Sequence, residues 1–364
     1  MLPCMTASPA TPALFEPLRL RDLQLRNRVV VSPMCQYSSA DGFLNDWHLV
    51  HLGSRAVGGA ALVIVEATAV TPEGRITPWD AGLWSDLHVP ALARCARFVR
   101  EQGAAAGIQL AHAGRKAGCA RPWEGGARLS EAEGGWTAVA PSPVPFRPDE
   151  PAPLPLDGER IAGIVGAFAA AARRALAAGF EVVEVHAAHG YLLHEFLSPL
   201  ANHREDAYGG AFDNRVRVVL DVARGVRAVW PEALPVFVRI SATDWVDGGW
   251  DLEQSVELAR RLGALGVDLV DCSSGGILPG VRVPTGPGYQ AGFAERIRRE
   301  AGVPTGAVGL ITRAEQAEAI IAEGRADLVL LARELLRDPY WPLHAARQLG
   351  AAPAWPPQYL RAAE

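Results

Sequence analysis

Eight short apolar runs recur along the chain, and helix-like segments separate them. The runs are NRVVVSPM (27–34), ALVIVEATA (61–69), GIQLAHAG (107–114), EVVEVHAAH (181–189), PVFVRISA (235–242), VDLVDCSSG (267–275), VPTGAVG (303–309) and ADLVLLARE (326–334). Most are almost continuously apolar, as parallel strands buried on both faces are. Eight strand–helix alternations predict an α/β fold, a single closed (β/α)8 TIM barrel. The alternative, an open doubly wound sheet, would be expected to carry a G-x-G-x-x-G turn after its first strand, and none is found there.

The intervening segments have helical periodicity. In 216–230, apolar residues fall at positions i, i+3, i+4, i+7 and i+10, which places them on one helical face (Val216, Val219, Leu220, Ala223 and Val226). The segments 252–265 and 315–323 have a similar pattern. Glycines at 179, 266 and 324 mark the turns from helix to the next strand.

One connection is much longer than the others. About seventy residues separate the third and fourth strands, and seven of the fifteen residues in 141–155 are proline, which excludes a helix or a central strand there. We therefore expect 118–157 to be an excursion of a single barrel domain (14–350) that covers one end of the barrel, with room for a short hairpin. Residues 1–13 and the Pro-rich 351–364 read as loosely ordered tails.

The bulk properties describe an ordinary globular chain. It has 364 residues and a formal net charge of −5, which gives no reason to expect nucleic acid or an anionic membrane as a partner. No apolar run is long enough to span a bilayer, and the N-terminal stretch has no secretory signal pattern. The five cysteines form no C-x-x-C pair. This argues against a disulfide framework, a structural zinc or an iron–sulfur cluster, and favours a cytoplasmic protein.

Polar residues gather where the predicted strands end, the usual place of the active site in this fold. They come from seven of the eight strands: Ser32 to Cys35, Gln109 and His112, His186, His189 and Tyr191, Arg239, Ser273 and Ser274, Gly309, and Arg333. Gly309 and Arg333 follow the seventh and eighth strands, where a glycine turn and a guanidinium suit a phosphate group. We therefore predict a site in the barrel mouth for a phosphorylated ligand.

Residue types that are missing narrow the chemistry. Lys116, the only lysine, lies after the third strand, an uncommon place for a Schiff-base lysine. His186 and His189 could both ligate a metal, but only Asp244 and Asp247 offer nearby carboxylates. We therefore predict no metal site.

Eight motifs, in order along the chain, identify a protein family that this sequence resembles. SPMCQYS (32–38), VEATAV (65–70), QLAHAGRKA (109–117), HAAHGYLLHEFLSPLANHREDAYGG (186–210), VRISATDW (238–245), GAVGLIT (306–312), ARELLRDPYW (332–341) and PPQYLR (356–361) together resemble the Old Yellow Enzyme family of FMN-dependent ene-reductases. The similarity runs from about residue 14 to 361. Cysteine within SPMCQYS and the tail arginine point to the bacterial thermophilic-like, or YqjM-like, branch.

The resemblance implies FMN as cofactor and NADPH as reductant. The backbone of Ser32, Pro33, Met34, Cys35 and Ala67 would line the flavin ring. Gln109 would bind its pyrimidine edge, and Arg239 would face the N1–C2 carbonyl region, where negative charge collects on reduction. Ala332 and Arg333 would hold the phosphate, with Gly309.

The resemblance also implies an NADPH-dependent reduction of the C=C bond of enones or nitro compounds. His186 and His189 would bind the substrate oxygen, Tyr191 would protonate the α-carbon, and Tyr37 would help to bind the substrate. Arg361 would enter the neighbouring subunit's site, which implies a homodimer or homotetramer with residues 351–364 at the interface.

Other interpretations of the same residues stay open at this point. The histidines and Cys35 are also compatible with core positions, Tyr191 with packing, and Arg239 with an interior ion pair. Arg115 and Lys116 read as solvated loop charges or as contacts to the NADPH phosphate. For the whole chain, the alternatives are a flavin-free lyase or isomerase acting on a phosphorylated substrate, and a ligand-binding barrel without turnover. The physiological substrate and the choice of NADPH over NADH are not determined.

Overall fold

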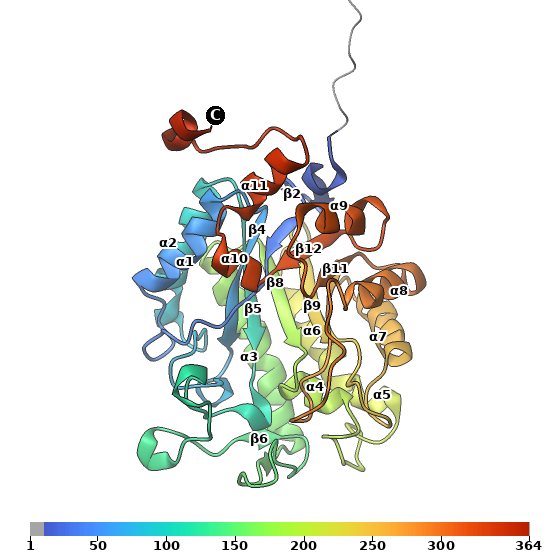
Figure 1. Ribbon diagram of the computed structural model, residues 1–364. Helices are drawn as coiled ribbons and strands as arrows, with labels where there is room; N and C mark the ends of the chain where they lie inside the picture. Colours follow the sequence, from blue (N-terminus) through green and yellow to red (C-terminus); the bar gives the residue numbers. More distant parts are fainter. Residues whose placement is uncertain (1–10, 364) are drawn as a thin grey trace, which may run out of the picture.

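The computed structural model describes residues 11–363, and its centre is a closed barrel of eight parallel strands (Figure 1). The strands follow one another around the barrel in chain order, and β12 pairs with β3 to close it. They are β3 (Val29–Val31), β4 (Leu62–Ala69), β5 (Ala105–Ala111), β8 (Val182–Ala187), β9 (Val236–Ser241), β10 (Leu269–Ser273), β11 (Thr305–Val308) and β12 (Leu328–Leu331). Each lies within or beside one of the eight predicted runs, so the predicted TIM barrel is confirmed.

Helices surround the barrel, as the sequence pattern predicts (Figure 1). They are α1 (Asp46–Val57), α2 (Val89–Glu101), α3 (Gly158–Ala177), α4 (Leu192–Leu197), α5 (Phe212–Arg215), α6 (Arg217–Val229), α7 (Leu252–Ala264), α8 (Ala291–Ala301), α9 (Ala314–Ala322), α10 (Arg333–Arg337) and α11 (Trp341–Gln348). Short 3₁₀ turns lie at Ala13–Phe15, Pro72–Gly74, Asp86–His88, Gly114–Lys116, Pro122–Glu124, Glu131–Glu133 and Pro357–Ala362. None of the described helices is long and apolar enough to cross a membrane.

The barrel interior changes from apolar to polar along the strands. Near their N-terminal ends, inward residues such as Val182, Phe237 and Leu269 form one apolar cluster. A hairpin of β1 (Leu18–Leu20) and β2 (Leu23–Leu25) packs against this cluster. On a strand, every second side chain faces the same side. The inward side chains further along the strands are polar. The apolar side chains at the N-terminal ends of the strands therefore stabilise the barrel, and the polar side chains gather toward the C-terminal ends.

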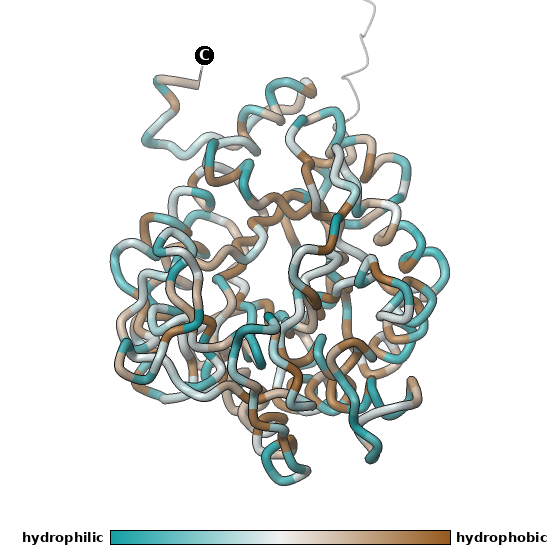
Figure 2. The backbone as a smooth tube through the Cα atoms, turned by 60° about the horizontal axis from the view of Figure 1, so that its bottom comes forward, coloured by the Kyte–Doolittle hydropathy of each residue, from teal (hydrophilic) through white to brown (hydrophobic). Residues whose placement is uncertain are grey.

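The long third connection, which the sequence predicts to be an excursion, lies beside the C-terminal end of β5, where Arg115 donates to the carbonyls of Val144 and Pro145. It contains two very short strands, β6 (Val139–Ala140) and β7 (Leu154–Pro155). These pair in parallel, so the pair is not the hairpin for which the sequence left room. Figure 2, turned so that this end comes forward, shows hydrophilic, neutral and hydrophobic stretches alternating along the backbone.

The two ends of the described chain differ in how closely they pack on the barrel. Residues 1–10 of the predicted N-terminal tail lie outside the described residues, and Leu14 is already fully buried. At the other end, the Tyr359 hydroxyl lies 3.5 Å from that of Tyr340, and Trp355 lies beside His344. The 3₁₀ turn at Pro357–Ala362 projects from the barrel beyond α11, at the opposite end of the view from β6 (Figure 1).

Candidate active site

Four neighbouring strands place a buried polar cluster beneath the barrel mouth. Gln109 on β5 stands beside Glu184 on β8, and its Nε2 donates to Glu184 Oε1 over 2.8 Å. Arg239 on β9 stands beside Asp271 on β10, with 2.9 Å between Nε and Oδ2. A terminal nitrogen of Arg239 also donates to Ser32 Oγ at 3.1 Å. Arg239 therefore has the interior ion pair that the sequence left open, and it also lies among residues predicted to contact the flavin.

The two predicted histidines and Tyr191 come together above this cluster. His186 Nε2 lies 3.4 Å from His189 Nδ1, and His189 Nε2 lies 2.7 Å from Ser273 Oγ. The Tyr191 ring packs edge-on against His186, with 5.2 Å between ring centroids. Three potential donors of N–H or O–H groups therefore face one small region of the mouth.

The protonation of these groups follows from their burial. Burial and the nearby Arg239 hold the pKa of both His186 and His189 well below the usual range, so both rings are neutral at neutral pH. His186 Nδ1 accepts the Ala188 N–H at 3.3 Å, which leaves the hydrogen on Nε2. Burial also raises the pKa of Tyr191, so the phenol keeps its proton. The site offers neutral donors and no imidazolium ion.

The loop that carries His189 and Tyr191 is fixed by contacts that the sequence did not reveal. Lys116 Nζ donates to the carbonyls of His189 at 2.8 Å and Gly276 at 3.2 Å. The Gly190 N–H donates to Nδ1 of the fully buried His194 at 2.9 Å. His194 Nε2 in turn lies 2.9 Å from Asp244 Oδ1. Asp244, considered above as a possible metal ligand, thus supports the loop through His194.

Arg115 and Lys116 are therefore not the solvated loop charges considered above. Arg115 is 2% exposed, and its guanidinium donates to the carbonyls of Val144, Pro145 and Ile277. The Lys116 ammonium lies 4.9 Å from the centre of the Tyr191 ring. These carbonyls come from the excursion and from the loop after β10, so Arg115 ties the excursion to the mouth.

The loop after β3 also borders the mouth, where Ser32 accepts from Arg239. Ser32 is buried, whereas Pro33, Met34, Cys35 and Tyr37 are half-buried. Burial, Asp80 and Glu66 raise the pKa of the Cys35 thiol, so it stays protonated. Burial likewise raises the pKa of Tyr37, whose ring meets Trp123 of the excursion edge-on at 6.0 Å. Ala67 on β4 is buried, beyond a register shift in the pairing with β5.

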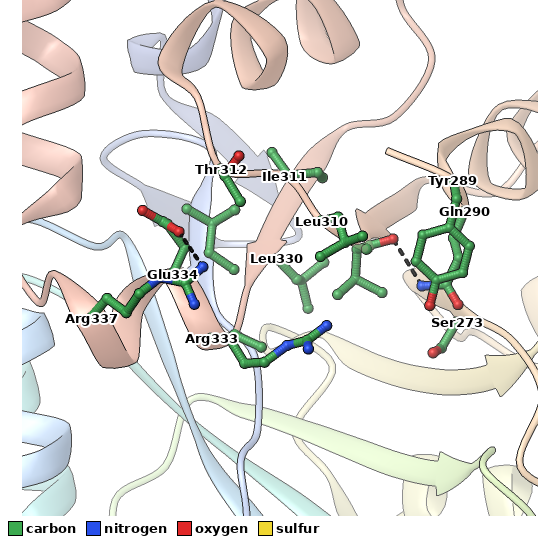
Figure 3. A pocket seen from close by; sticks show the side chains of 14 residues that line it. Ser273, Tyr289, Gln290, Leu310, Ile311, Thr312, Leu330, Arg333, Glu334 and Arg337 are labelled. Atoms are coloured by element: carbon green, nitrogen blue, oxygen red, sulfur yellow. Dashed lines mark hydrogen bonds and ion pairs between the residues drawn. The ribbon is translucent and has the colours of Figure 1, made fainter. Parts of the chain in front are cut away.

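A pocket of about 260 Å³ lies at the ends of β11 and β12 (Figure 3). Gly309, Ala332 and Arg333 line it, and so do Ser273 and Tyr289 from the other side. The Arg333 guanidinium extends into the pocket, whereas Arg337 turns to Glu334 at 2.8 Å (Figure 3). Among the described residues, Arg333 forms no ion pair, so it presents an uncompensated cation.

Arg361 is not brought to the mouth of its own barrel. It lies exposed in the projecting 3₁₀ turn, and it lines neither the phosphate pocket nor the cavity beside Tyr37 and Lys116. The geometry thus joins every other predicted site residue into two adjoining regions, the mouth and the phosphate pocket.

Comparison with known proteins decides the family. The model of the NADH:flavin oxidoreductase / NADH oxidase family matches residues 13–351. The chain belongs to this family. An NADPH dehydrogenase of Geobacillus thermodenitrificans is 50% identical over 350 residues, which cover 96% of this chain and 98% of that protein. The NADPH dehydrogenase of Bacillus subtilis is 47% identical over the same shares of the two chains.

Two solved structures have the same architecture. Morphinone reductase superimposes with a TM-score of 0.77 at 29% identity, covering 95% of this chain and 92% of that one. The Old Yellow Enzyme homologue from Zymomonas mobilis gives 0.78 at 28% identity and covers 93% of both chains. The resemblance to the Old Yellow Enzyme family is thereby confirmed.

The chain is therefore an FMN-dependent NADPH dehydrogenase of the Old Yellow Enzyme type, with FMN as cofactor and NADPH as reductant. The residues present fit that cofactor, because the unpaired Arg333 suits a phosphate and the mouth has polar partners for a flavin edge. The flavin-free lyase or isomerase and the barrel without turnover are both wrong.

Sequence reasoning missed Glu184 and Asp271, although a signal for them was present. In β8, β9 and β10, the inward positions read Val182, Glu184, His186, then Phe237, Arg239, Ser241, then Leu269, Asp271, Ser273. Each strand thus goes from an apolar to a charged to a polar inward residue. Reading every second residue would have placed both carboxyl groups inside the barrel, as it does Arg239.

Proposed function

We propose that the enzyme reduces the C=C bond of α,β-unsaturated carbonyl or nitro compounds. The observation that carries the proposal is the convergence of His186, His189 and Tyr191, all neutral, at one point of the mouth. When bound, FMN supplies the chemistry of accepting hydride from NADPH and delivering it to the substrate.

In this proposal, the chain holds FMN through two regions. The backbone of Ser32 to Cys35 and Ala67 would line the ring, Gln109 would bind the pyrimidine edge, and Arg239 would face the N1–C2 carbonyl region. Gly309, Ala332 and Arg333 bind the phosphate. The support is the common location of the first group in the mouth and of the second in one pocket.

His186 and His189 bind and polarise the substrate oxygen through neutral N–H groups. These groups are directed to each other and to Ser273, so a substrate oxygen that enters the mouth would meet donors that are already oriented. A preorganised donor of this kind contributes about 3 kcal/mol to transition-state stabilisation. Tyr37 completes the substrate pocket.

Tyr191 holds the proton that reaches the α-carbon. Its raised pKa keeps the phenol protonated at neutral pH, as a general acid must be before it acts. The ring is held by His186 on one side and by the Lys116 ammonium on the other. In this proposal, the Tyr191 hydroxyl is therefore held close to the histidines that bind the substrate oxygen.

An anaerobic titration tests the function. NADPH is added to the purified yellow protein while the flavin absorbance is followed, and then cyclohexenone is added. We expect NADPH to bleach the band and cyclohexenone to restore it. Reoxidation by oxygen but by neither enones nor nitroalkenes would refute the substrate class while leaving the NADPH dehydrogenase intact.

We further propose a cytoplasmic homodimer or homotetramer in which Arg361 enters the neighbouring subunit's site. The exposed position of Arg361 on a projecting turn supports this proposal. The four described cysteines are all unpaired, which suits a reducing compartment.

A further inference from the structure

The buried cluster beneath the mouth holds two carboxyl groups beside one guanidinium group. Glu184 and Asp271 are both 0% exposed, and Arg239 is the guanidinium between β8 and β10. Of these two carboxyl groups, Asp271 forms the ion pair with that guanidinium, at 2.9 Å from Nε. Glu184 faces the Gln109 amide instead, at 2.8 Å. The two carboxyl groups therefore have different electrostatic roles.

The Arg239 guanidinium has different partners at different nitrogens. A terminal nitrogen donates to Ser32 in the mouth, whereas Asp271 contacts Nε. Asp271 is fully buried, so it has no surface on which a ligand in the mouth could bind directly. Its charge therefore acts on a flavin in the mouth as part of the ion pair with Arg239.

The protonation of the two carboxyl groups also differs. Burial and the neighbouring Asp271 raise the pKa of Glu184 to about 8. Burial raises the pKa of Asp271 to about 6, against the opposing attraction of Arg239. The contacts favour the charge on Asp271, because Asp271 lies 2.9 Å from a guanidinium nitrogen whereas the direct partner of Glu184 is the neutral Gln109 amide.

We propose that Asp271 is a positioning residue that sets the reduction potential of the flavin, because it forms an ion pair with Arg239 at Nε and offsets part of the Arg239 charge. A cation near the N1–C2 carbonyl region favours the reduced flavin, which collects negative charge there. A buried anion paired with that cation weakens the effect, so Asp271 keeps the potential lower than Arg239 alone would. The inference rests on the proposed placement of the flavin against Arg239.

The test is the two-electron reduction potential of the FMN in the holoenzyme at pH 7, measured by anaerobic spectroelectrochemistry. Asp271→Asn removes the anion and keeps the shape of the side chain. We expect it to raise the ratio of reduced to oxidised flavin at fixed potential at least tenfold, an upward shift of about 30 mV for a two-electron couple. Asp271→Ser removes the same charge from a smaller side chain and is expected to shift the potential in the same direction.

Glu184→Gln is the matched control, since it replaces a neutral acid by a neutral amide in the same cluster. We expect it to leave the potential close to that of the wild type. An unchanged or lowered potential in both Asp271 variants would overturn the inference, as would an equal upward shift in Glu184→Gln.

Arg239→Gln separates this failure from a failure of the proposed site. If the flavin lies against Arg239, this variant lowers the potential. A lowered potential in Arg239→Gln together with no shift in the Asp271 variants refutes the role of Asp271 alone. No shift in Arg239→Gln refutes the placement of the flavin, and the inference with it.

Discussion

At the scale of single residues, the site depends on a backbone turn that most residues avoid. His189 has φ +59° although it carries a β-carbon, and Gly190 follows at φ +71°. Such a conformation costs about 1–2 kcal/mol for an L-residue and persists only where surrounding contacts fix it. Here Lys116 binds the His189 carbonyl, and His194 binds the Gly190 N–H. The turn directs His189 and Tyr191 toward His186.

Gly190→Ala tests how closely this turn is packed. A β-carbon at Gly190 would lie 2.0 Å from the carbonyl oxygen of Gly276, which is backbone and has to move. Gly210→Ala is the control, because Gly210 has nearly the same φ, +72°, and no atom within 4 Å of the added carbon. We expect Gly210→Ala to lose about 1 kcal/mol of stability from strain alone. Gly190→Ala should lose clearly more and also lower turnover, whereas equal losses in denaturant unfolding would contradict the close packing.

Tyr191→Phe tests the proton donor. We expect reoxidation of the reduced flavin by cyclohexenone to slow by about 10² to 10⁴-fold, the usual contribution of a general acid. Reduction of the flavin by NADPH should change far less, because that step transfers no proton from Tyr191. Tyr208→Phe, whose ring packs on Phe196, serves as control. Stopped-flow absorbance measures the rates of both half-reactions. If Tyr191→Phe is reoxidised by the enone at the wild-type rate, Tyr191 is not the proton donor.

At the scale of elements, the short helix α10 is important because it places Arg333 at the phosphate pocket. The helix α10 has only five residues, too few to be stable by itself. It is held because Leu335 is fully buried and because the Leu335 carbonyl accepts from Arg55 on α1. The element thereby presents Arg333 to the pocket at the ends of β11 and β12.

Arg333→Gln should weaken FMN binding selectively. Hydrogen bonds to charged groups contribute about 1.5–3 kcal/mol, so we expect the dissociation constant to rise about 10- to 150-fold. The matched control is Arg337→Gln, in the same helix, because Arg337 is paired with Glu334. Fluorescence titration of the apoprotein with FMN measures both. Equal effects of the two changes would show that Arg333 does not bind the phosphate.

At the scale of the whole molecule, the closed barrel buries several carboxyl groups that a small surface site would leave in water. Burial raises the pKa of Glu66, Glu184 and Glu195 to about 8 each. Each therefore keeps its proton in the folded state at a pH where it is ionised in the unfolded chain. Such groups make the fold less stable as the pH rises through this range.

Glu184→Gln should reveal this cost. Between pH 4.5 and 8 the unfolded chain has lost the Glu184 proton and the folded chain holds it, so the wild type loses stability as the pH rises. The amide does not titrate, and the variant should gain in relative stability from pH 5 to pH 8. Denaturant unfolding at several pH values measures the difference. A difference that is constant with pH, or that shrinks toward pH 8, would contradict the raised pKa.

Arg361→Ala tests the proposed sharing of sites between subunits. We expect its kcat/KM for cyclohexenone to fall about 10- to 100-fold, the value of one charged hydrogen bond. Mixed with Tyr191→Phe chains under conditions of subunit exchange, it should recover activity above either parent. In the mixed dimer, one site then has its own Tyr191 and the partner's intact arginine. No recovery in verified mixed dimers would place Arg361 outside the neighbouring site.

The sequence by itself determined the barrel and most of the candidate site. Eight apolar runs separated by amphipathic segments have one common solution, because parallel strands buried on both faces need helices around them. The carboxyl ends of parallel barrel strands meet at one mouth, so the sequence alone predicts that His186, Arg239 and Arg333 lie in neighbouring regions.

The tertiary structure alone decided which polar groups pair and which of them are charged. Asp271, Glu184, His194 and Lys116 looked like ordinary strand, helix and loop residues, because their partners lie up to 160 positions away in the chain. The short β1–β2 hairpin and the parallel β6–β7 pair also follow from packing rather than from local pattern. Burial, which shifts each pKa, is a property of the assembled molecule, so no local stretch of sequence contains it.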